Sequence, residues 1–191
     1  QQKRGSAYFF GDGLTALDAI GPYDVFRHTP GWKVSFVARQ AGEIRTEDGA
    51  LGLVADTGFD DVTDADILLV PGGAGTRPML GDVEVLDWIR AVDQETKWTT
   101  SVCTGSLALA AAGLLEGRRA TGHWLYLEPL REFGAEPVTG RWVEDGKYLT
   151  AAGVSAGIDM ALHLVGHEAG PEVAEAVQLG IEYDPQPPFD D

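Results

Sequence analysis

The single cysteine of this chain, Cys103, lies where the sequence changes abruptly from strand-forming to helix-forming residues. Residues 99–102 are mostly β-branched and suit a strand, whereas Leu107–Ala112 favour a helix, and no room is left for a loop between them. A residue between a strand and a helix faces a crevice with free backbone N–H groups and the positive end of a helix dipole. We therefore expect a nucleophile elbow whose thiol ionises easily. The alternative is a small buried cysteine that only packs.

Asp18 is the second candidate, because a carboxylate stands inside the apolar stretch Leu17–Ile20. It either caps a helix that follows Gly21 or points inward at a site. The third candidate is the segment that follows the apolar run Ile67–Val70, where Gly72 and Gly73 would let backbone N–H groups approach a ligand. This segment lacks the spacing of a phosphate-binding loop.

Histidines provide two further candidate positions. His123 is either a surface or capping residue or a neighbour of Cys103, because alternating strands and helices return the chain to one crevice. His163 and His167 have the spacing of metal ligands on a helix, but no third ligand accompanies them. We therefore predict ordinary helix residues there and no metal site.

Composition excludes several classes of partner. The net charge of -16 comes from 30 acidic and 14 basic residues, so the basic surface that nucleic acids and anionic membranes require is missing. No apolar run has the length of a membrane span, and no signal-peptide pattern is visible. One cysteine excludes an internal disulfide and fits a reducing cytoplasm. We expect residues 1–191 to form one domain, with Gln1–Gly5 as a trimmed or disordered start.

The remaining pattern alternates strands and helices, which predicts an α/β sandwich around a mostly parallel sheet. The predicted elements are strands at 6–10, 33–38 and 67–70, a small strand or hairpin at 44–54, a hairpin at 141–150, a helix at 14–26 interrupted at Gly21–Pro22, a helix at 83–92, a helix that follows His123 and runs to about 133, a helix at 156–165 capped by Ser155, a last helix at 171–181, and a non-helical tail after it.

Five segments together resemble the ThiJ/PfpI superfamily, which is similar to class I glutamine amidotransferases: Asp18–Phe26, Val70–Gly73, Ser101–Gly105, Ala120–Trp124 and Ala152–Asp159. The resemblance implies a three-layer, flavodoxin-like sandwich with a nucleophile elbow. Within the superfamily, these segments and the tail Ile181–Phe189 are similar to isonitrile hydratases and to the sensor halves of AraC-type regulators. We expect no DNA-binding part, because the chain has no room for one after Asp191.

The resemblance also assigns roles to residues. It implies that Cys103 is the nucleophile, Asp18 its acidic partner and Thr104 a site residue beside the cysteine. Gly73, with Gly72 beside it, would donate a backbone N–H to developing negative charge. His123 stands at the family's histidine position, in the substrate-binding region. A small-molecule substrate, no cofactor and a homodimer are the further expectations from this likeness.

Three hypotheses of function follow. In the first, Cys103 attacks the carbon of an isonitrile, and the thioimidate is hydrolysed to an N-substituted formamide with Asp18 moving the protons. In the second, the same pair converts an α-oxoaldehyde, as glyoxalase-type relatives do. In the third, Cys103 is not catalytic and is oxidised to a sulfinate in a redox-sensing or ligand-binding module.

Overall fold

A seven-stranded sheet organises the computed structural model, which describes residues 4–190. The strand order is β10-β11-β7-β6-β1-β2-β5, and every neighbouring pair is parallel except the hairpin β10–β11. Two small pairs lie outside it, the antiparallel β3–β4 and the parallel β8–β9. The strands are β1 Arg4–Phe9, β2 Trp32–Ala38, β3 Gly42–Arg45, β4 Gly52–Ala55, β5 Thr57–Gly58, β6 Ile67–Val70, β7 Trp98–Val102, β8 Arg119–Ala120, β9 Glu136–Pro137, β10 Trp142–Asp145 and β11 Tyr148–Ala151.

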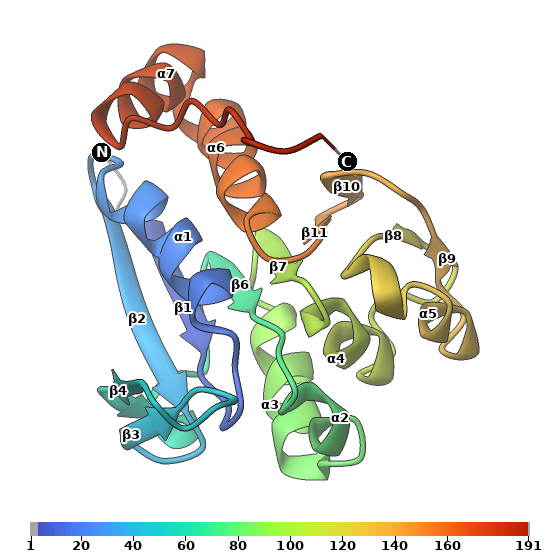
Figure 1. Cartoon of the computed structure of the whole chain (residues 1–191). Helices are drawn as coiled ribbons and strands as arrows, with labels where there is room; N and C mark the ends of the chain where they lie inside the picture. Colours follow the sequence, from blue (N-terminus) through green and yellow to red (C-terminus); the bar gives the residue numbers. More distant parts are fainter. Residues whose placement is uncertain (1–3, 191) are drawn as a thin grey trace.

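Helices cover both faces of the sheet, so the predicted three-layer α/β sandwich is confirmed (Figure 1). One layer contains α1, α6 and α7, and the other contains α2 to α5. The helices are α1 Ala16–Arg27, α2 Thr76–Met79, α3 Val83–Asp93, α4 Gly105–Ala111, α5 Pro129–Glu132, α6 Ala156–Ala169 and α7 Pro171–Gly180, with 3-10 turns η1 Phe59–Asp61 and η2 Trp124–Tyr126. No helix in the described residues is long and apolar enough to cross a membrane.

The central strands have a core on each side, because successive side chains of a strand point to opposite faces. In β6, Leu68 and Val70 belong to the core under α3 and α4, whereas Ile67 and Leu69 belong to the core under α1 and α6. All four side chains are buried. This explains why the sequence of β6 is a continuous apolar run rather than an alternating one.

The loops after β1 and β6 meet at the point where the strand order of the sheet reverses. β1 lies between β2 and β6, so the segments that follow β1 and β6 leave the same edge. Thr15 N–H donates to the Gly72 carbonyl (2.9 Å), and Gly75 N–H donates to the Gly13 carbonyl (3.1 Å). Such a switch point is where open α/β sheets usually bind ligands.

The predicted interruption of the first helix at Gly21–Pro22 is wrong. A single helix, α1, runs through both residues. Tertiary packing explains it: a Cβ on Gly21 would lie 2.8 Å from Ile158 Cγ1, and one on Gly157 would lie 3.1 Å from Pro22 Cγ. The two glycines let α1 and α6 approach closely, and this contact compensates for the hydrogen bond that proline removes.

Two other local predictions need correction. The helix expected from His123 to about 133 is split into η2 and α5, because Pro129 starts a new helical turn and cannot continue the old one. Ser155 stands before α6 but makes no capping hydrogen bond; its hydroxyl accepts from Arg141 instead (3.3 Å).

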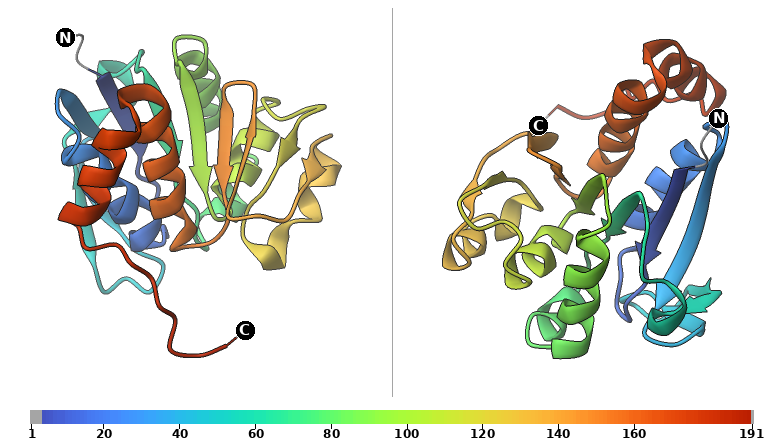
Figure 2. Two further views of the ribbon diagram at one scale, coloured as in Figure 1. Left: turned by 90° about the horizontal axis from the view of Figure 1, so that it is seen from above. Right: turned by 180° about the vertical axis from the view of Figure 1, so that it is seen from behind.

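The prediction of a disordered start is wrong for Arg4 and Gly5, whereas the prediction of a non-helical tail is confirmed. Arg4 and Gly5, expected at a disordered start, belong to β1, while residues 1–3 lie outside the described residues. The tail after α7 is non-helical, as predicted, and extends away from the body of the molecule (Figure 2, left). Tyr183 tethers its beginning by donating to Asp159 Oδ1 (3.1 Å).

Candidate active site

Cys103 occupies the sharp turn between β7 and α4, as the sequence predicts. Its φ is 61°, in the left-handed region that residues with a side chain rarely adopt. Such a conformation costs about 1–2 kcal/mol and persists only where the surroundings enforce it. Here the Cys103 N–H is held by the carbonyls of Ala151 and Ala152, at 3.2 Å each. The strained turn is therefore anchored to the neighbouring strand β11.

Glycines make room for this elbow. A Cβ on Gly105 would lie 2.0 Å from the Val70 carbonyl oxygen, and one on Gly122 would lie 2.9 Å from the Cys103 carbonyl oxygen. A Cβ on Gly72 would lie 2.5 Å from both the backbone nitrogen and Oγ1 of Thr104. Backbone therefore packs against backbone on three sides of the cysteine, and no other residue type fits these positions without displacement.

Asp18 is completely buried on α1 and points inward, so the capping alternative is excluded. Its Oδ2 accepts the Gly72 N–H (2.9 Å), while the buried Oδ1 accepts no conventional hydrogen bond within the described part of the chain. Burial raises the pKa of this carboxyl to about 7; the Gly72 N–H opposes that shift, the charge of Glu47 adds to it, and the Cys103 thiol lowers it slightly. Asp18 can therefore gain and lose a proton near neutral pH.

The expectation that the thiol ionises easily is wrong for this conformation. Burial raises the pKa of Cys103 to about 12, and the negative charges of Asp18 and Glu47 contribute to the shift. The backbone and side chain of Thr104 lower this pKa, but they do not compensate for burial. Cys103 is 4% exposed and α4 is only seven residues long, so desolvation outweighs the helix end. In this conformation the thiol therefore keeps its proton at neutral pH, and it interacts with the carboxyl of Asp18.

Thr104 joins the elbow to the glycine loop. Its Oγ1 accepts the Gly73 N–H (3.0 Å) and lies 3.0 Å from the Thr76 hydroxyl. The backbone donor that the family likeness assigns to Gly73 is therefore already engaged by Thr104. Gly73 itself has a φ of 128°, and a Cβ there would lie 2.4 Å from the Gly13 carbonyl oxygen.

The residues of the site lie within a segment that is similar to known proteins. The model of the DJ-1/PfpI family matches residues 7–167, which include the elbow, Asp18 and the glycine loop. The chain belongs to the DJ-1/PfpI family. Isonitrile hydratase of Pseudomonas putida is 46% identical over 174 residues, covering 91% of this chain and 76% of the relative.

A solved structure and a longer curated relative show how far the likeness extends. A crystal structure of a ThiJ/PfpI family protein from Pseudomonas syringae has a TM-score of 0.96 at 38% identity, covering all of this chain and 79% of the other. The HTH-type transcriptional regulator CdhR of Pseudomonas aeruginosa is 31% identical over 166 residues, which are 84% of this chain and 48% of the regulator. The chain thus spans about four fifths of the first protein and about half of the second.

His123 caps a turn. Its Nδ1 accepts the Leu125 N–H (3.2 Å), and its ring stacks on Trp124 with centroids 6.0 Å apart. A Cβ on Gly153 would lie 2.5 Å from His123 Cδ2, so the ring borders the loop after β11, the strand next to β7. The structure thus places His123 against the loop that follows β11, with its Nδ1 bonded to its own turn.

Metal ligation has no support in the described residues. His163 contacts Glu144 (3.1 Å), and the ring of His167 packs edge-on against Trp98. No group of three histidine, cysteine or acidic side chains in residues 4–190 could hold an ion.

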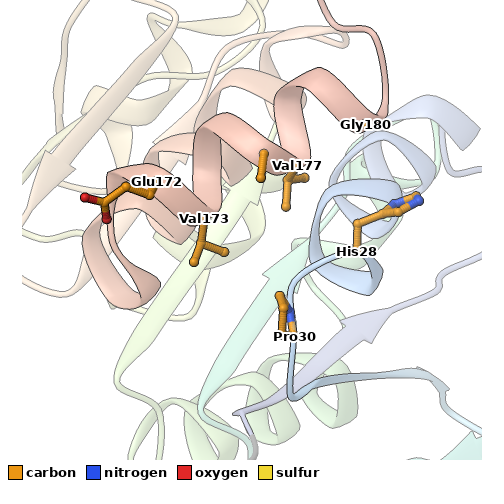
Figure 3. A pocket seen from close by; sticks show the side chains of 7 residues that line it. His28, Pro30, Glu172, Val173, Val177 and Gly180 are labelled. Atoms are coloured by element: carbon orange, nitrogen blue, oxygen red, sulfur yellow. The ribbon is translucent and has the colours of Figure 1, made fainter.

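Of two hollows in the described residues, one lies away from the candidate site and the other borders it. A groove of about 320 Å³ lies between α7 and the end of α1, lined by His28, Val173 and Val177, and it contains none of the predicted site residues (Figure 3). A smaller crevice at the ends of β1 and β6 is lined in part by Gly72 and Thr76. The second one borders the site.

Glu47 is the site residue that the sequence did not reveal. It lies in the connection of the β3–β4 hairpin, where Glu47–Gly49 predict only a turn. Its carboxylate accepts the Thr15 hydroxyl (3.2 Å) and the Ala74 N–H (3.1 Å), and its charge acts on both Asp18 and Cys103. No local motif marks this residue, because the contact depends on how the hairpin docks against two distant loops.

Proposed function

We propose that this protein is a hydratase that adds water to an isonitrile and releases an N-substituted formamide, with Cys103 as nucleophile and Asp18 as the group that moves protons. The observation that carries the proposal is the buried pair itself: a carboxyl with a pKa of about 7 coupled to the only cysteine, on a strained elbow. The 46% identity to the Pseudomonas putida isonitrile hydratase over 91% of the chain supports this substrate class.

In the first step, the Asp18 carboxylate accepts the proton of the Cys103 thiol as the sulfur bonds to the terminal carbon of the isonitrile. Asp18 then delivers that proton to the same carbon. The product is a thioimidate, R–N=CH–S–Cys103, and Asp18 is a carboxylate again. The thiol pKa of about 12 makes this base necessary, because very little free thiolate exists at neutral pH.

In the second step, Asp18 removes a proton from a water molecule whose oxygen bonds to the thioimidate carbon, and it passes this proton to the nitrogen. The carbon–sulfur bond then breaks, and the remaining hydroxyl proton returns to sulfur. Formamide and thiol are released. The backbone N–H groups of Thr104 and Gly73 are proposed to stabilise the charge of this stage, with Gly73 exchanging the Thr104 hydroxyl for the substrate.

Every atom in this cycle comes from the substrate, water and two side chains, so the proposal includes independence of metals and organic cofactors. His123, whose ring borders the loop after β11, is proposed to contact the substituent of the substrate. A homodimer and a cytoplasmic location complete the proposal, the latter because an unpaired cysteine suits a reducing compartment.

The test is to incubate the protein with n-butyl isonitrile or phenyl isonitrile and to measure the N-substituted formamide product by mass spectrometry. We expect the native protein to turn over at least one of them and Cys103→Ala to lose turnover while remaining folded by circular dichroism. Asp24→Asn, on the exposed side of α1, is the matched control. Turnover retained by Cys103→Ala would remove the covalent scheme.

Two other outcomes identify the remaining hypotheses. Conversion of methylglyoxal to lactate without isonitrile turnover would establish the glyoxalase-type reaction. Selective addition of two oxygens to Cys103 by mild peroxide, with no turnover of any substrate, would establish redox sensing. The raised thiol pKa and 4% exposure of Cys103 disfavour this last outcome, because oxidation follows thiolate character and access.

A further inference from the structure

Glu47 links three segments that are far apart in the sequence. One carboxylate oxygen accepts the hydroxyl of Thr15, just before α1, and the other accepts the N–H of Ala74, in the loop after β6. The Glu47 N–H also donates to the Leu14 carbonyl (3.2 Å). The side chain thus bridges the segment that starts the Asp18 helix and the loop whose N–H groups hold Asp18 and Thr104.

This bridge affects Asp18 and Thr104 indirectly, through the glycine loop that contacts both of them. Ala74 follows the two glycines of this loop. The Gly72 N–H donates to Asp18, and the Gly73 N–H donates to Thr104. If the Ala74 N–H loses its acceptor, the glycine loop loses the support that the side chain of Glu47 gives it from the hairpin. Misplacement of such a loop by about 1 Å is enough to slow a reaction strongly.

The negative charge of Glu47 also acts electrostatically on Asp18 and Cys103. Asp18 and Cys103 are buried, whereas Glu47 is exposed to solvent and carries its negative charge outside the buried pair. This charge raises the pKa of both Asp18 and Cys103. The other charged groups around the hairpin turn are Asp48, which holds the turn, Arg45, which pairs with Glu43, and Asp12, which accepts the Arg45 N–H.

We propose that Glu47 is a positioning residue of the site, which holds the glycine loop against the start of α1 and presents its negative charge to the Cys103–Asp18 pair. A consequence concerns the substrate. A carboxylate outside a buried, already acidic site repels anions, so neutral or cationic substrates are favoured over anionic ones. The statement about substrates rests on the proposed function, whereas the statement about the pair does not.

Alkylation of Cys103 by iodoacetamide tests the pair without any isonitrile, because the chain has one cysteine. The alkylation rate is measured against pH for the native protein, Glu47→Gln, Glu47→Ala and the control Glu43→Gln, which removes a carboxylate of the same hairpin that pairs with Arg45. For Glu47→Gln we expect the profile to move about half a unit to lower pH, since one nearby charge is lost. Glu43→Gln should match the native protein. Equal profiles for Glu47→Gln and the native protein, or an equal shift in Glu43→Gln, would overturn the proposal.

Isonitrile turnover tests the positioning role. Glu47→Ala, which loses both hydrogen bonds, should lower kcat/KM about tenfold, whereas Glu47→Gln, which retains an acceptor for Ala74, should lose far less. The ratio of kcat/KM for isocyanoacetate to that for its neutral methyl ester should rise severalfold in Glu47→Gln and stay unchanged in Glu43→Gln. An unchanged ratio would contradict the assignment. Absence of turnover in the native protein would refute the proposed function, and the alkylation profiles would still decide the role of Glu47.

Discussion

The hydroxyl of Thr104 accepts the N–H of Gly73 at 3.0 Å and lies 3.4 Å from the Gly73 carbonyl, and it thereby connects the nucleophile elbow to the glycine loop of the neighbouring strand. Without the hydroxyl, the Gly73 N–H has no acceptor at a partly buried position, which costs about 1–3 kcal/mol. Thr104→Val, which preserves shape, should therefore lower both the free energy of unfolding and kcat/KM, the latter about tenfold or more. Thr104→Ser keeps the hydroxyl and should stay within a few-fold of the native protein. Equal activities of the two variants, measured by formamide production, would exclude a role for the hydroxyl.

The pH dependence of the reaction should follow Asp18. The thiol proton needs an ionised acceptor, and burial holds the pKa of Asp18 at about 7. We expect kcat/KM to rise as pH increases through about 7 and then to level off, because this quantity reports groups of the free enzyme. Asp18→Asn should abolish most activity and remove this rise. Asp24→Asn, the control on the same helix, should keep the profile of the native protein.

Asp18 should also make the protein less stable at high pH. Its pKa is raised from 3.8 to about 7, so between these values the native state binds a proton that the unfolded chain has released. The free energy of unfolding therefore falls as pH rises through this window, and the full cost is present above about pH 7. Asp18→Asn should be more stable than the native protein at pH 8, and this advantage should shrink towards pH 4. Urea denaturation at the two pH values measures it, and a pH-independent difference would contradict burial of an ionisable carboxyl as the cause.

The strained backbone of Cys103 predicts an unusual order of stability. At an ordinary helical position such as Ala111, replacing alanine by glycine costs about 1 kcal/mol. At position 103 the φ of 61° favours glycine over any residue with a Cβ. Cys103→Gly should thus be at least as stable as Cys103→Ala in urea denaturation, whereas Ala111→Gly should be less stable than the native protein. A more stable Cys103→Ala would show that the elbow is not strained.

Local patterns were sufficient to predict the elements that carry the site. The continuous apolar run Ile67–Val70 predicted a central strand, and the abrupt change around Cys103 predicted the elbow, because both depend on residues adjacent in sequence. Properties that depend on docking were not predictable. The helix through Pro22 requires the contact between α1 and α6, and the direction of the Cys103 pKa shift requires knowledge of burial. Glu47 enters the site only through the placement of a hairpin.

Gly72 provides the sharpest test of the packing around the elbow. Its N–H holds Asp18, and a Cβ there would lie 2.5 Å from Thr104 N and Oγ1, a distance that real contacts do not reach. The obstructing atoms include backbone, so relaxation must displace the loop or the elbow. Gly72→Ala should consequently lose activity and unfold at a lower temperature. Gly81→Ala is the matched control, because no atom lies within 4 Å of its added Cβ, and it should behave as the native protein does. If Gly72→Ala retained native turnover and melting temperature, then the close approach of the two loops would not be a requirement of the site.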